Sequence, residues 1–346
     1  TATLDNQRVL GFVTETGGRA SHTAIVAAAL EIPAVVGVGG LLEIAQAAQP
    51  QVAIIDGDEG VLILDPTDAT LARYRQLAAQ RQARFQGLAC LADLPAITLD
   101  GTRHTLLGNI EFPGESAACL ERGAEGVGLY RTEFLYLNTD HPPTEEEQYH
   151  AYRAVVEAMR GRPVTIRTLD LGADKIASFT KPLDFIERNP FLGLRSIRLS
   201  LRDRDLFRTQ LRAIFRAACH GDLRVLLPMI TTLSELREVR ALMGDVAAEL
   251  ADAGEPHRGQ IPVGVMIEVP AAALVTDHLA QACDFFSIGT NDLIQYTLAV
   301  DRTSPYVAHL YDAADPSVLR LLAQVVAAAA QRGLEVAVCG AMGGEP

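Results

Sequence analysis

Residues 284–302 read Asp284-Phe-Phe-Ser-Ile-Gly-Thr-Asn-Asp-Leu-Ile-Gln-Tyr-Thr-Leu-Ala-Val-Asp-Arg302, and this stretch decides the fold. Its apolar segment, residues 285–288, is short and typical of a buried strand. Asn291 and Asp292 follow shortly after it, and an amide beside a carboxylate at a strand end can hold a metal ion and an anionic ligand together. Arg302 supplies a guanidinium for the same place. The structural alternative is that Asn291 and Asp292 only cap a helix.

The composition predicts a soluble protein with one large domain and a smaller one. The chain has 346 residues, of which 49% are hydrophobic and 21% charged. No apolar run approaches the length of a membrane span, and no secretory signal opens the chain. The formal net charge of −13 argues against a nucleic-acid partner. Because the five cysteines are scattered and odd in number, we expect a reducing cytoplasm.

Residues 1–65 are expected to form a first unit. Three segments predict its strands, the last of them with a hairpin turn, at residues 9–14, 33–38 and 52–64. Between the first two, a pair of glycines precedes an alanine-rich run that favours a helix and places His22 in its first turn. Free N–H groups there favour an anion, so His22 is suited to carry a phosphoryl group on a ring nitrogen. The alternative role of His22 is that of a polar cap.

The remainder of the chain is expected to contain a linker and a large α/β domain. A helix predicted to start around Pro66 and to end near Gln86 forms the linker, residues 66–95. From residue 96 to residue 346, strand and helix patterns alternate, which implies parallel strands with crossover helices. The predicted strands are 105–110, 126–130, 164–166, 225–228, 263–267, 285–288 and 335–338. They indicate a (β/α)₈ barrel of the TIM type that lacks its last strand and helix, with two free sheet edges.

Polar or reactive residues follow five of these predicted strands, namely Arg131, Arg167, Glu268, Asn291 with Asp292, and Cys339. In a barrel of this type, catalytic groups project from the carboxyl ends of the strands. Each residue alone also suits a cap, a surface ion pair or a core thiol. Their recurrence at the same end of successive strands favours a site.

The residue types indicate the chemistry of this site. Glu268 and Asp292 are oxygen ligands suited to Mg²⁺. Arg131, Arg167 and Arg302 offer forked donors for a phosphate or carboxylate. The thiol of the cysteine acts as a proton donor or as a nucleophile, depending on its pKa. We therefore expect a small ligand with several negative charges that undergoes phosphoryl and proton transfer.

Several long motifs, in the same order, resemble enzyme I of the phosphoenolpyruvate-dependent sugar phosphotransferase system. They are Gly-Gly-Arg-Ala-Ser-His22-Thr-Ala-Ile-Val-Ala, Gly-Val-Gly-Leu-Tyr-Arg131-Thr-Glu-Phe-Leu, Asn189-Pro-Phe-Leu-Gly-Leu-Arg, Gly-Thr-Asn291-Asp292 with its continuation to Arg302, and Val-Cys339-Gly. The resemblance covers nearly the whole chain.

The resemblance implies a reaction and its site residues. Phosphoenolpyruvate binds the barrel with Mg²⁺, gives its phosphoryl group to His22, and leaves as pyruvate after protonation by Cys339. Glu268 and Asp292 hold the metal, and the substrate contacts are Arg131, Arg167, Asn291, Asp292 and Arg302. Phosphohistidine then donates to a histidine of the carrier protein HPr, the first step of sugar uptake. The family also forms homodimers.

The chain departs from the family pattern at several places. The helical insertion that docks HPr, the eighth barrel strand and the dimerisation segment are absent, so we expect a chain shortened at both ends. The alanines Ala20, Ala28 and Ala341 stand where the family usually has threonine, arginine and glutamate. Two alternatives stay open: a fragment of pyruvate phosphate dikinase or phosphoenolpyruvate synthase, and a catalytically silent module that binds phosphoenolpyruvate.

Overall fold

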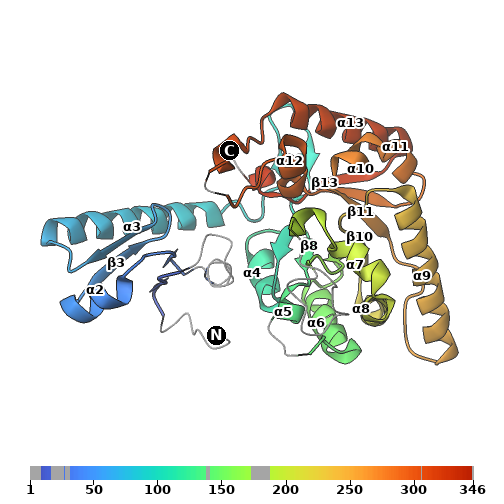
Figure 1. The fold of residues 1–346 in the computed structure, drawn as a ribbon, viewed down its shortest axis with the longest axis horizontal. Coiled ribbons are helices and arrows are strands. Elements are labelled where there is room, and N and C mark those ends of the chain that lie inside the picture. Colours follow the sequence, from blue (N-terminus) through green and yellow to red (C-terminus); the bar gives the residue numbers. More distant parts are fainter. Residues whose placement is uncertain are drawn as a thin grey trace. The chain divides into compact units, whose positions relative to one another are not determined.

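The computed structural model describes residues 9–16, 27, 32–137, 141–172, 188–304 and 306–344. The chain divides into two compact units, Thr1–Leu94 and Pro95–Pro346, and each is described here by itself (Figure 1). The predicted helix start at His22, together with Ala20 and Ala28, lies outside the described residues.

Four short strands and two helices make up the described part of the first unit. Strand β1 pairs in parallel with β2, and β3 forms an antiparallel hairpin with β4. Helices α2 and α3 follow β2 and β4. The element bounds are β1 Phe12–Val13, β2 Ala34–Val35, α2 Leu41–Ala48, β3 Ala53–Asp56, β4 Val61–Leu64 and α3 Asp68–Ala89. The predicted hairpin in 52–64 is confirmed, whereas β1 and β2 are shorter than predicted.

Helix α3 begins later than the sequence suggested. We predicted a start around Pro66, but the first helical residue is Asp68 and the cap is Thr67. The Thr67 side-chain oxygen accepts a hydrogen bond from the backbone N–H of Thr70 at 3.3 Å, which satisfies a donor that the first helical turn leaves free. The helix also continues past the predicted end, to Ala89.

The second unit is built on a seven-stranded parallel sheet in which each strand pairs with its neighbours in sequence, in the order β13-β12-β11-β10-β9-β8-β7. The predicted fold class, an α/β chain with an incomplete barrel of parallel strands, is therefore confirmed. The edges of the sheet are β7 and β13. The strand bounds are β7 Gly108–Ile110, β8 Val127–Arg131, β9 Val164–Arg167, β10 Leu223–Leu227, β11 Val263–Ile267, β12 Phe285–Ile288 and β13 Glu335–Val338.

The first predicted strand of this sheet, 105–110, is wrong in its first half. Arg103–His104 instead forms β6, which pairs antiparallel with β5, Ala96–Ile97. The parallel ladder between β7 and β8 is irregular between Gly108 and Asn109, which limits the regular strand to Gly108–Ile110. The predictions for β8 and β9 each stopped one residue short, so Arg131 and Arg167 are the last residues of their strands.

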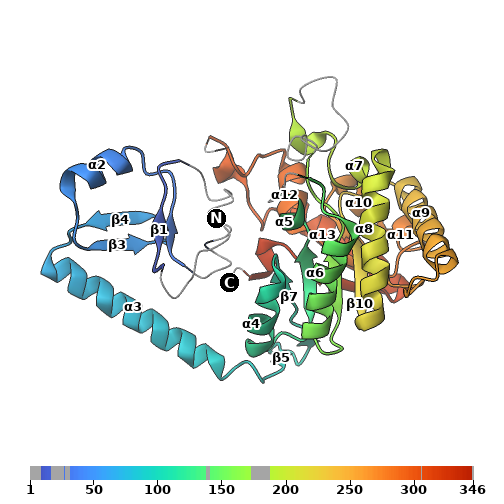
Figure 2. The ribbon, with the colours of Figure 1, turned by 90° about the horizontal axis from the view of Figure 1, so that it is seen from below.

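Helices connect the strands and cover the outside of the sheet, where α6, α8 and α9 lie side by side (Figures 1 and 2). Thr144 and Thr232 are the N-caps of α6 and α9, and each hydroxyl accepts a hydrogen bond from the backbone N–H of a glutamate three residues later. The bounds are α4 Ser116–Glu121, α5 Phe134–Leu137, α6 Glu145–Ala158, α7 Ser196–Arg202, α8 Arg204–Ala217, α9 Leu233–Asp252, α10 Pro270–Leu274, α11 Thr276–Leu279, α12 Thr290–Leu298 and α13 Pro316–Arg332. Among the described residues, no helix is both long and apolar enough to cross a membrane.

The core lies between the central strands and this helical layer. All five residues of β11 are buried, as are all four of β12. Strands that are covered on both faces carry nearly continuous apolar runs, which favoured the correct prediction of the bounds of these two. The bounds of the more exposed edge strand β13 were also predicted correctly. A rigid, close-packed core fixes the positions of the strand ends, and the site is built there.

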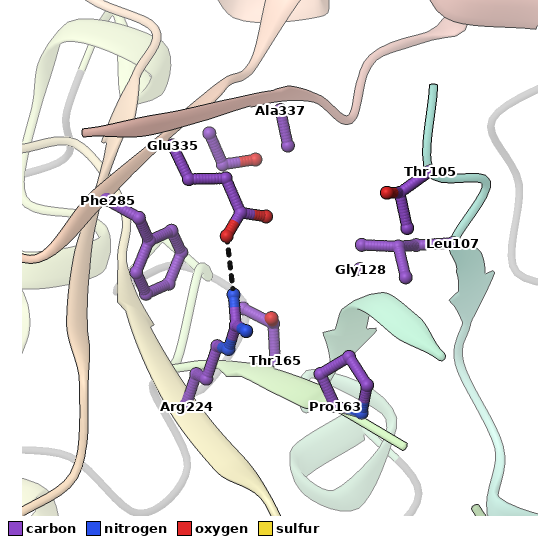
Figure 3. A pocket seen from close by; sticks show the side chains of 10 residues that line it. Thr105, Leu107, Gly128, Pro163, Thr165, Arg224, Phe285, Glu335 and Ala337 are labelled. Atoms are coloured by element: carbon purple, nitrogen blue, oxygen red, sulfur yellow. Dashed lines mark hydrogen bonds and ion pairs between the residues drawn. The ribbon is translucent and has the colours of Figure 1, made fainter. Parts of the chain in front are cut away.

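A cavity of about 210 Å³ lies at the amino ends of the strands, away from the predicted site residues. Figure 3 shows Arg224 of β10 reaching Glu335 of β13 inside it, at 3.0 Å. Residues next to both sheet edges line it, Leu107 before β7 and Ala337 in β13. The cavity is therefore lined both by residues next to the sheet edges and by residues of the central strands.

Two buried tyrosines in this core make a matched test of the packing. Tyr130 and Tyr152 contact each other edge to face, with ring centroids 6.0 Å apart. The Tyr152 hydroxyl donates to Gln148 Oε1 at 2.9 Å and accepts from Gln210 Nε2 at 3.1 Å. The Tyr130 hydroxyl has no hydrogen-bond partner among the described residues.

We predict that Tyr152→Phe lowers the free energy of unfolding by about 1–3 kcal/mol, because it removes two hydrogen bonds from a buried network. Tyr130→Phe is expected to be neutral or slightly stabilising, since it removes a buried hydroxyl that is not satisfied. Urea denaturation followed by circular dichroism measures both. An equal loss of stability in the two variants would contradict the hydrogen-bond assignment.

Candidate active site at the carboxyl ends of the strands

The structure places the predicted barrel residues at the carboxyl end of the parallel sheet. Arg131 and Arg167 end β8 and β9, Glu268 directly follows β11, and Cys339 directly follows β13. Asp292 lies in the first turn of α12, which begins two residues after β12 ends. Because carboxyl ends of parallel strands meet at the same edge, these side chains share one region.

The capping alternative for Asn291 and Asp292 is wrong. The residue at the N-cap of α12 is Gly289, with no side-chain capping bond. A β-carbon on Gly289 would lie 2.8 Å from Glu268 Oε2, so the glycine lets the backbone pass close to this carboxylate. Asn291 Oδ1 instead accepts a hydrogen bond from the backbone N–H of Ala341 at 2.9 Å, which ties α12 to the segment after β13.

The most prominent feature of the site is a chain of alternating arginines and carboxylates. Arg167 contacts Glu133 at 2.9 Å and Asp170 at 2.8 Å. Arg195 continues the chain, at 3.0 Å from Asp170 and 3.3 Å from Asp292. Arg302 contacts Asp292 from the other side at 3.5 Å. Except for Arg302, these side chains are at most 11% exposed. The site is thus a buried ionic network with a more exposed arginine at its end.

Sequence reasoning missed four members of this site. Asp170 lies three residues after Arg167, and Arg195 ends the motif that begins at Asn189, so both had a local signal to which no role was given. Glu133 lies two residues after Arg131 in another quoted motif. Glu111 had no such signal, yet it contacts Arg131 at 2.6 Å.

Two residues with left-handed backbone conformations support the buried carboxylates. Ser196 has φ 54° and donates its hydroxyl to Asp170 Oδ1. Met229 has φ 56°, and its backbone N–H donates to Glu268 Oε1 at 2.7 Å. Such conformations are uncommon for residues other than glycine and cluster at functional sites.

The network shifts the pKa values of its carboxyl groups in opposite directions. Burial disfavours the ionised form of Asp170, but the adjacent Arg167 and Arg195 outweigh it and hold the pKa of Asp170 well below its usual range. For Glu268, burial is the largest cause and the charges of Asp170 and Asp292 add to it, so its pKa lies well above its usual value despite Arg167. The site therefore contains a strongly ionised carboxylate beside one that resists ionisation.

The thiol of Cys339 is protonated at neutral pH. Burial is the largest cause of its raised pKa. Its Sγ donates to the carbonyl oxygen of Ile288 at 3.4 Å. The carbonyl oxygen of Cys339 accepts from Asn109 Nδ2 at 3.4 Å, a contact between the β7 edge and the loop after β13. A protonated thiol is suited to donate a proton rather than to attack as a nucleophile.

A magnesium ion fits the carboxylates at this end of the sheet. Within the described ranges, no group of three or more His, Cys, Asp or Glu side chains is arranged to hold a metal. Mg²⁺, however, is commonly held by one or two carboxylates and completes its shell with water and substrate oxygens. Burial and the charges of Asp170 and Asp292 raise the pKa of Glu268, and a bound cation would favour the ionised form of this carboxyl. Glu268 and Asp292 therefore suit such an ion.

An incomplete barrel of parallel strands with arginines, carboxylates and a protonated thiol at its carboxyl end is the architecture of an α/β-barrel enzyme. Residues 86–346 match the family model described as PEP-utilising enzyme, PEP-binding domain. Residues 1–60 match the model described as PEP-utilising enzyme, mobile domain. The chain belongs to the family of PEP-utilising enzymes.

Curated relatives in this family carry the name phosphoenolpyruvate-protein phosphotransferase. The chain is 46% identical over 346 residues to the one from Geobacillus stearothermophilus, which covers 100% of this chain and 59% of that relative. Identity to the Staphylococcus aureus (strain MRSA252) protein is 45% over 345 residues, covering 100% of this chain and 60% of the relative. Identity to the Cupriavidus necator protein is 48% over 343 residues, covering 97% of this chain and 57% of the relative. The chain thus spans about three-fifths of the length of these relatives.

The raised pKa of Glu268 predicts a pH-dependent cost to stability. Below pH 4.5, the ordinary pKa of a glutamate, the carboxyl is protonated in both the folded and the unfolded chain. As the pH rises above that value, the unfolded chain releases the proton and the folded protein keeps it, so stability falls. Glu268→Gln cannot ionise and should be more stable than the wild type at pH 8, with a difference that shrinks toward pH 5.

While only the unfolded chain has released the proton, the difference should grow by up to about 1.4 kcal/mol per pH unit. Thermal and urea unfolding with EDTA at several pH values measure it. Glu249→Gln, which alters an exposed glutamate on α9, serves as the control. A difference between Glu268→Gln and the wild type that does not change with pH would refute the shifted pKa.

Proposed function

We propose that the protein accepts the phosphoryl group of phosphoenolpyruvate on His22, releases pyruvate, and passes the phosphoryl group to a histidine of the carrier protein HPr. The observation that supports this best is the convergence of site arginines, Glu268, Asp292 and a protonated Cys339 at one end of the barrel. Phosphoenolpyruvate carries a phosphate and a carboxylate, and its product needs one proton on carbon. The names of the relatives agree with this donor.

In this proposal, one part of the chain accepts the phosphoryl group and another binds the substrate. Residues 1–65 carry His22, residues 66–95 form a helical linker, and residues 96–346 bind phosphoenolpyruvate. In the barrel, the substrate contacts are Arg131, Arg167, Asn291, Asp292 and Arg302. Glu268 and Asp292 hold Mg²⁺, which would neutralise phosphate charge and help to orient the substrate.

The reaction balances with these groups. The bond between phosphorus and the enol oxygen breaks, and a bond between phosphorus and a ring nitrogen of His22 forms. The electron pair stays on the enol oxygen. Cys339 then delivers its proton to the terminal carbon to give pyruvate, and its thiolate regains a proton from water. Site arginines stabilise the charge on the transferring group and on the enolate.

Transfer onward to HPr would make this the first step of sugar uptake by a phosphotransferase system in the cytoplasm. The proposal for this partner depends on the relatives' names and on the motif around His22. It is separable from the first half-reaction, because labelling of His22 needs phosphoenolpyruvate and Mg²⁺ but no carrier protein.

The proposed function predicts a metal-dependent phosphohistidine. Incubation with ³²P-labelled phosphoenolpyruvate and Mg²⁺ should give a label that is lost in acid and stable in base, because phosphohistidine has this lability. The label should be absent without Mg²⁺ and in His22→Ala. Labelled wild-type protein is then mixed with HPr, and transfer is followed by gel electrophoresis. If phosphoenolpyruvate binds and His22 stays unlabelled, the chain is a binding module and the phosphotransfer proposal is wrong.

The role of Cys339 predicts a separation of binding from turnover. Cys339→Ala should bind phosphoenolpyruvate within about twofold of the wild type, whereas pyruvate formation should slow by about 10²-fold or more, because proton delivery acts on the enolate and not on the bound substrate. Calorimetry and a coupled lactate dehydrogenase assay measure the two quantities. Cys283→Ala, which removes a buried thiol that precedes β12 at the other end of the sheet, is the control. Normal pyruvate formation by Cys339→Ala would exclude it as the proton donor.

A further inference from the structure

We propose that Arg195 and Asp170 couple the cation site to the anion site, so that a divalent cation at Asp292 releases the Arg195 guanidinium toward the substrate anion. The proposal rests on the proposed function, because it assumes that both ligands bind at this end of the barrel. It assigns positioning roles to two residues that the sequence motifs left without one.

Arg195 is held by contacts from several elements. Its guanidinium contacts Asp170 after β9 and Asp292 in α12, and donates to the Tyr296 hydroxyl at 3.4 Å. The guanidinium carbon lies 5.8 Å from the centroid of the Phe191 ring. Tyr296 in turn donates its hydroxyl to the carbonyl oxygen of Phe191 at 2.5 Å. These contacts place the Arg195 guanidinium between the two carboxylates.

Asp292 is the point where a cation and Arg195 compete. Its Oδ2 lies 3.3 Å from the Arg195 guanidinium, and its Oδ1 lies 3.5 Å from that of Arg302. Both carboxylate oxygens therefore already face positive groups in the protein without a metal. A divalent cation that takes Asp292 as a ligand displaces these charges from it. The displaced guanidinium donors are then available to an anion.

Asp170 connects the displacement of Arg195 from Asp292 to the neighbouring Arg167. It is shared between Arg167 and Arg195, so Arg195 retains one carboxylate when it loses Asp292. The hydroxyl of Ser196 also donates to Asp170, which keeps the carboxylate in place. A change at Asp292 therefore reaches Arg167 through three successive ion pairs, Asp292 with Arg195, Arg195 with Asp170, and Asp170 with Arg167. If a bound cation raises the affinity for an anion that binds these arginines, then by linkage the bound anion raises the affinity for the cation by the same factor.

The coupling predicts effects of opposite sign on the two ligands. Arg195→Gln removes the competitor of the cation and a donor to the anion. We expect Mn²⁺ alone to bind about tenfold more tightly, and phosphoenolpyruvate at saturating Mn²⁺ to bind about tenfold more weakly. Asp170→Asn frees both arginines, so it should weaken Mn²⁺ binding and strengthen phosphoenolpyruvate binding by similar factors. Electron paramagnetic resonance measures Mn²⁺, and calorimetry measures phosphoenolpyruvate.

Two control variants separate this coupling from a general charge effect. Within the part of the chain that the structure describes, Arg131 pairs with Glu111 and makes no ion pair with Asp292. Arg131→Gln should therefore weaken phosphoenolpyruvate binding and leave Mn²⁺ affinity unchanged. Arg204→Gln removes an exposed arginine paired with Glu238 and should change neither. Circular dichroism establishes that each variant is folded. If Arg195→Gln does not fold, the reversed signs in Asp170→Asn still test the coupling.

The outcomes distinguish this inference from the proposed function. Opposite shifts in Arg195→Gln and Asp170→Asn, with Arg131→Gln affecting only phosphoenolpyruvate, support the coupling. Weaker binding of both ligands in folded Arg195→Gln would show that Arg195 is only structural and would overturn the inference, with the proposed function untouched. If the wild type binds Mn²⁺ but no phosphoenolpyruvate, the proposed function fails and the coupling fails with it.

Discussion

The ion pairs that Asp170 makes with Arg167 and Arg195 are the interaction on which the site depends. All three groups are buried, and taking charges out of water costs several kcal/mol per ion. The cost is offset because each charge contacts more than one partner and the Ser196 hydroxyl adds a hydrogen bond. Loss of one partner would leave an unpaired buried charge, typically a penalty of about 3–5 kcal/mol. The network therefore has few alternative arrangements, which suits a site that must present several charged groups at once.

The parallel sheet supplies the rigidity that such a network needs. Strands β9 to β12 are covered by helices, and their interior residues are almost entirely buried. Their carboxyl ends are fixed relative to each other by the β-ladders, so residues distant in sequence, such as Asp170 and Asp292, can share Arg195. The two sheet edges are less constrained. The contact between Asn109 and the carbonyl of Cys339 links their carboxyl ends, whereas the cavity with Arg224 and Glu335 lies at their amino ends.

Local sequence patterns were sufficient to predict the bounds of a strand where these depend mainly on the burial of the segment itself. Strands β11 and β12 were predicted with correct bounds because continuous apolar runs mark strands covered on both faces. At the β7 edge the prediction failed, since the irregular pairing at Gly108 depends on the partner strand and not on local composition. The capping alternative for Asn291 and Asp292 was excluded only by the structure. Both residue types are good caps, but the N-cap of α12 is Gly289, whose backbone passes close to Glu268.

The sequence by itself determined the order of the parallel strands, the family, and the positions along the chain of Arg131, Arg167, Glu268, Asp292 and Cys339, because strand periodicity and long motifs are local properties of the chain. Only the tertiary structure decided which charges pair. Arg195 and Glu111 became part of the site because strands and loops far apart in sequence meet at one end of the sheet. The pKa shifts of Glu268 and Cys339 also depend on the tertiary structure, since the burial and the neighbouring charges that cause them exist only after folding.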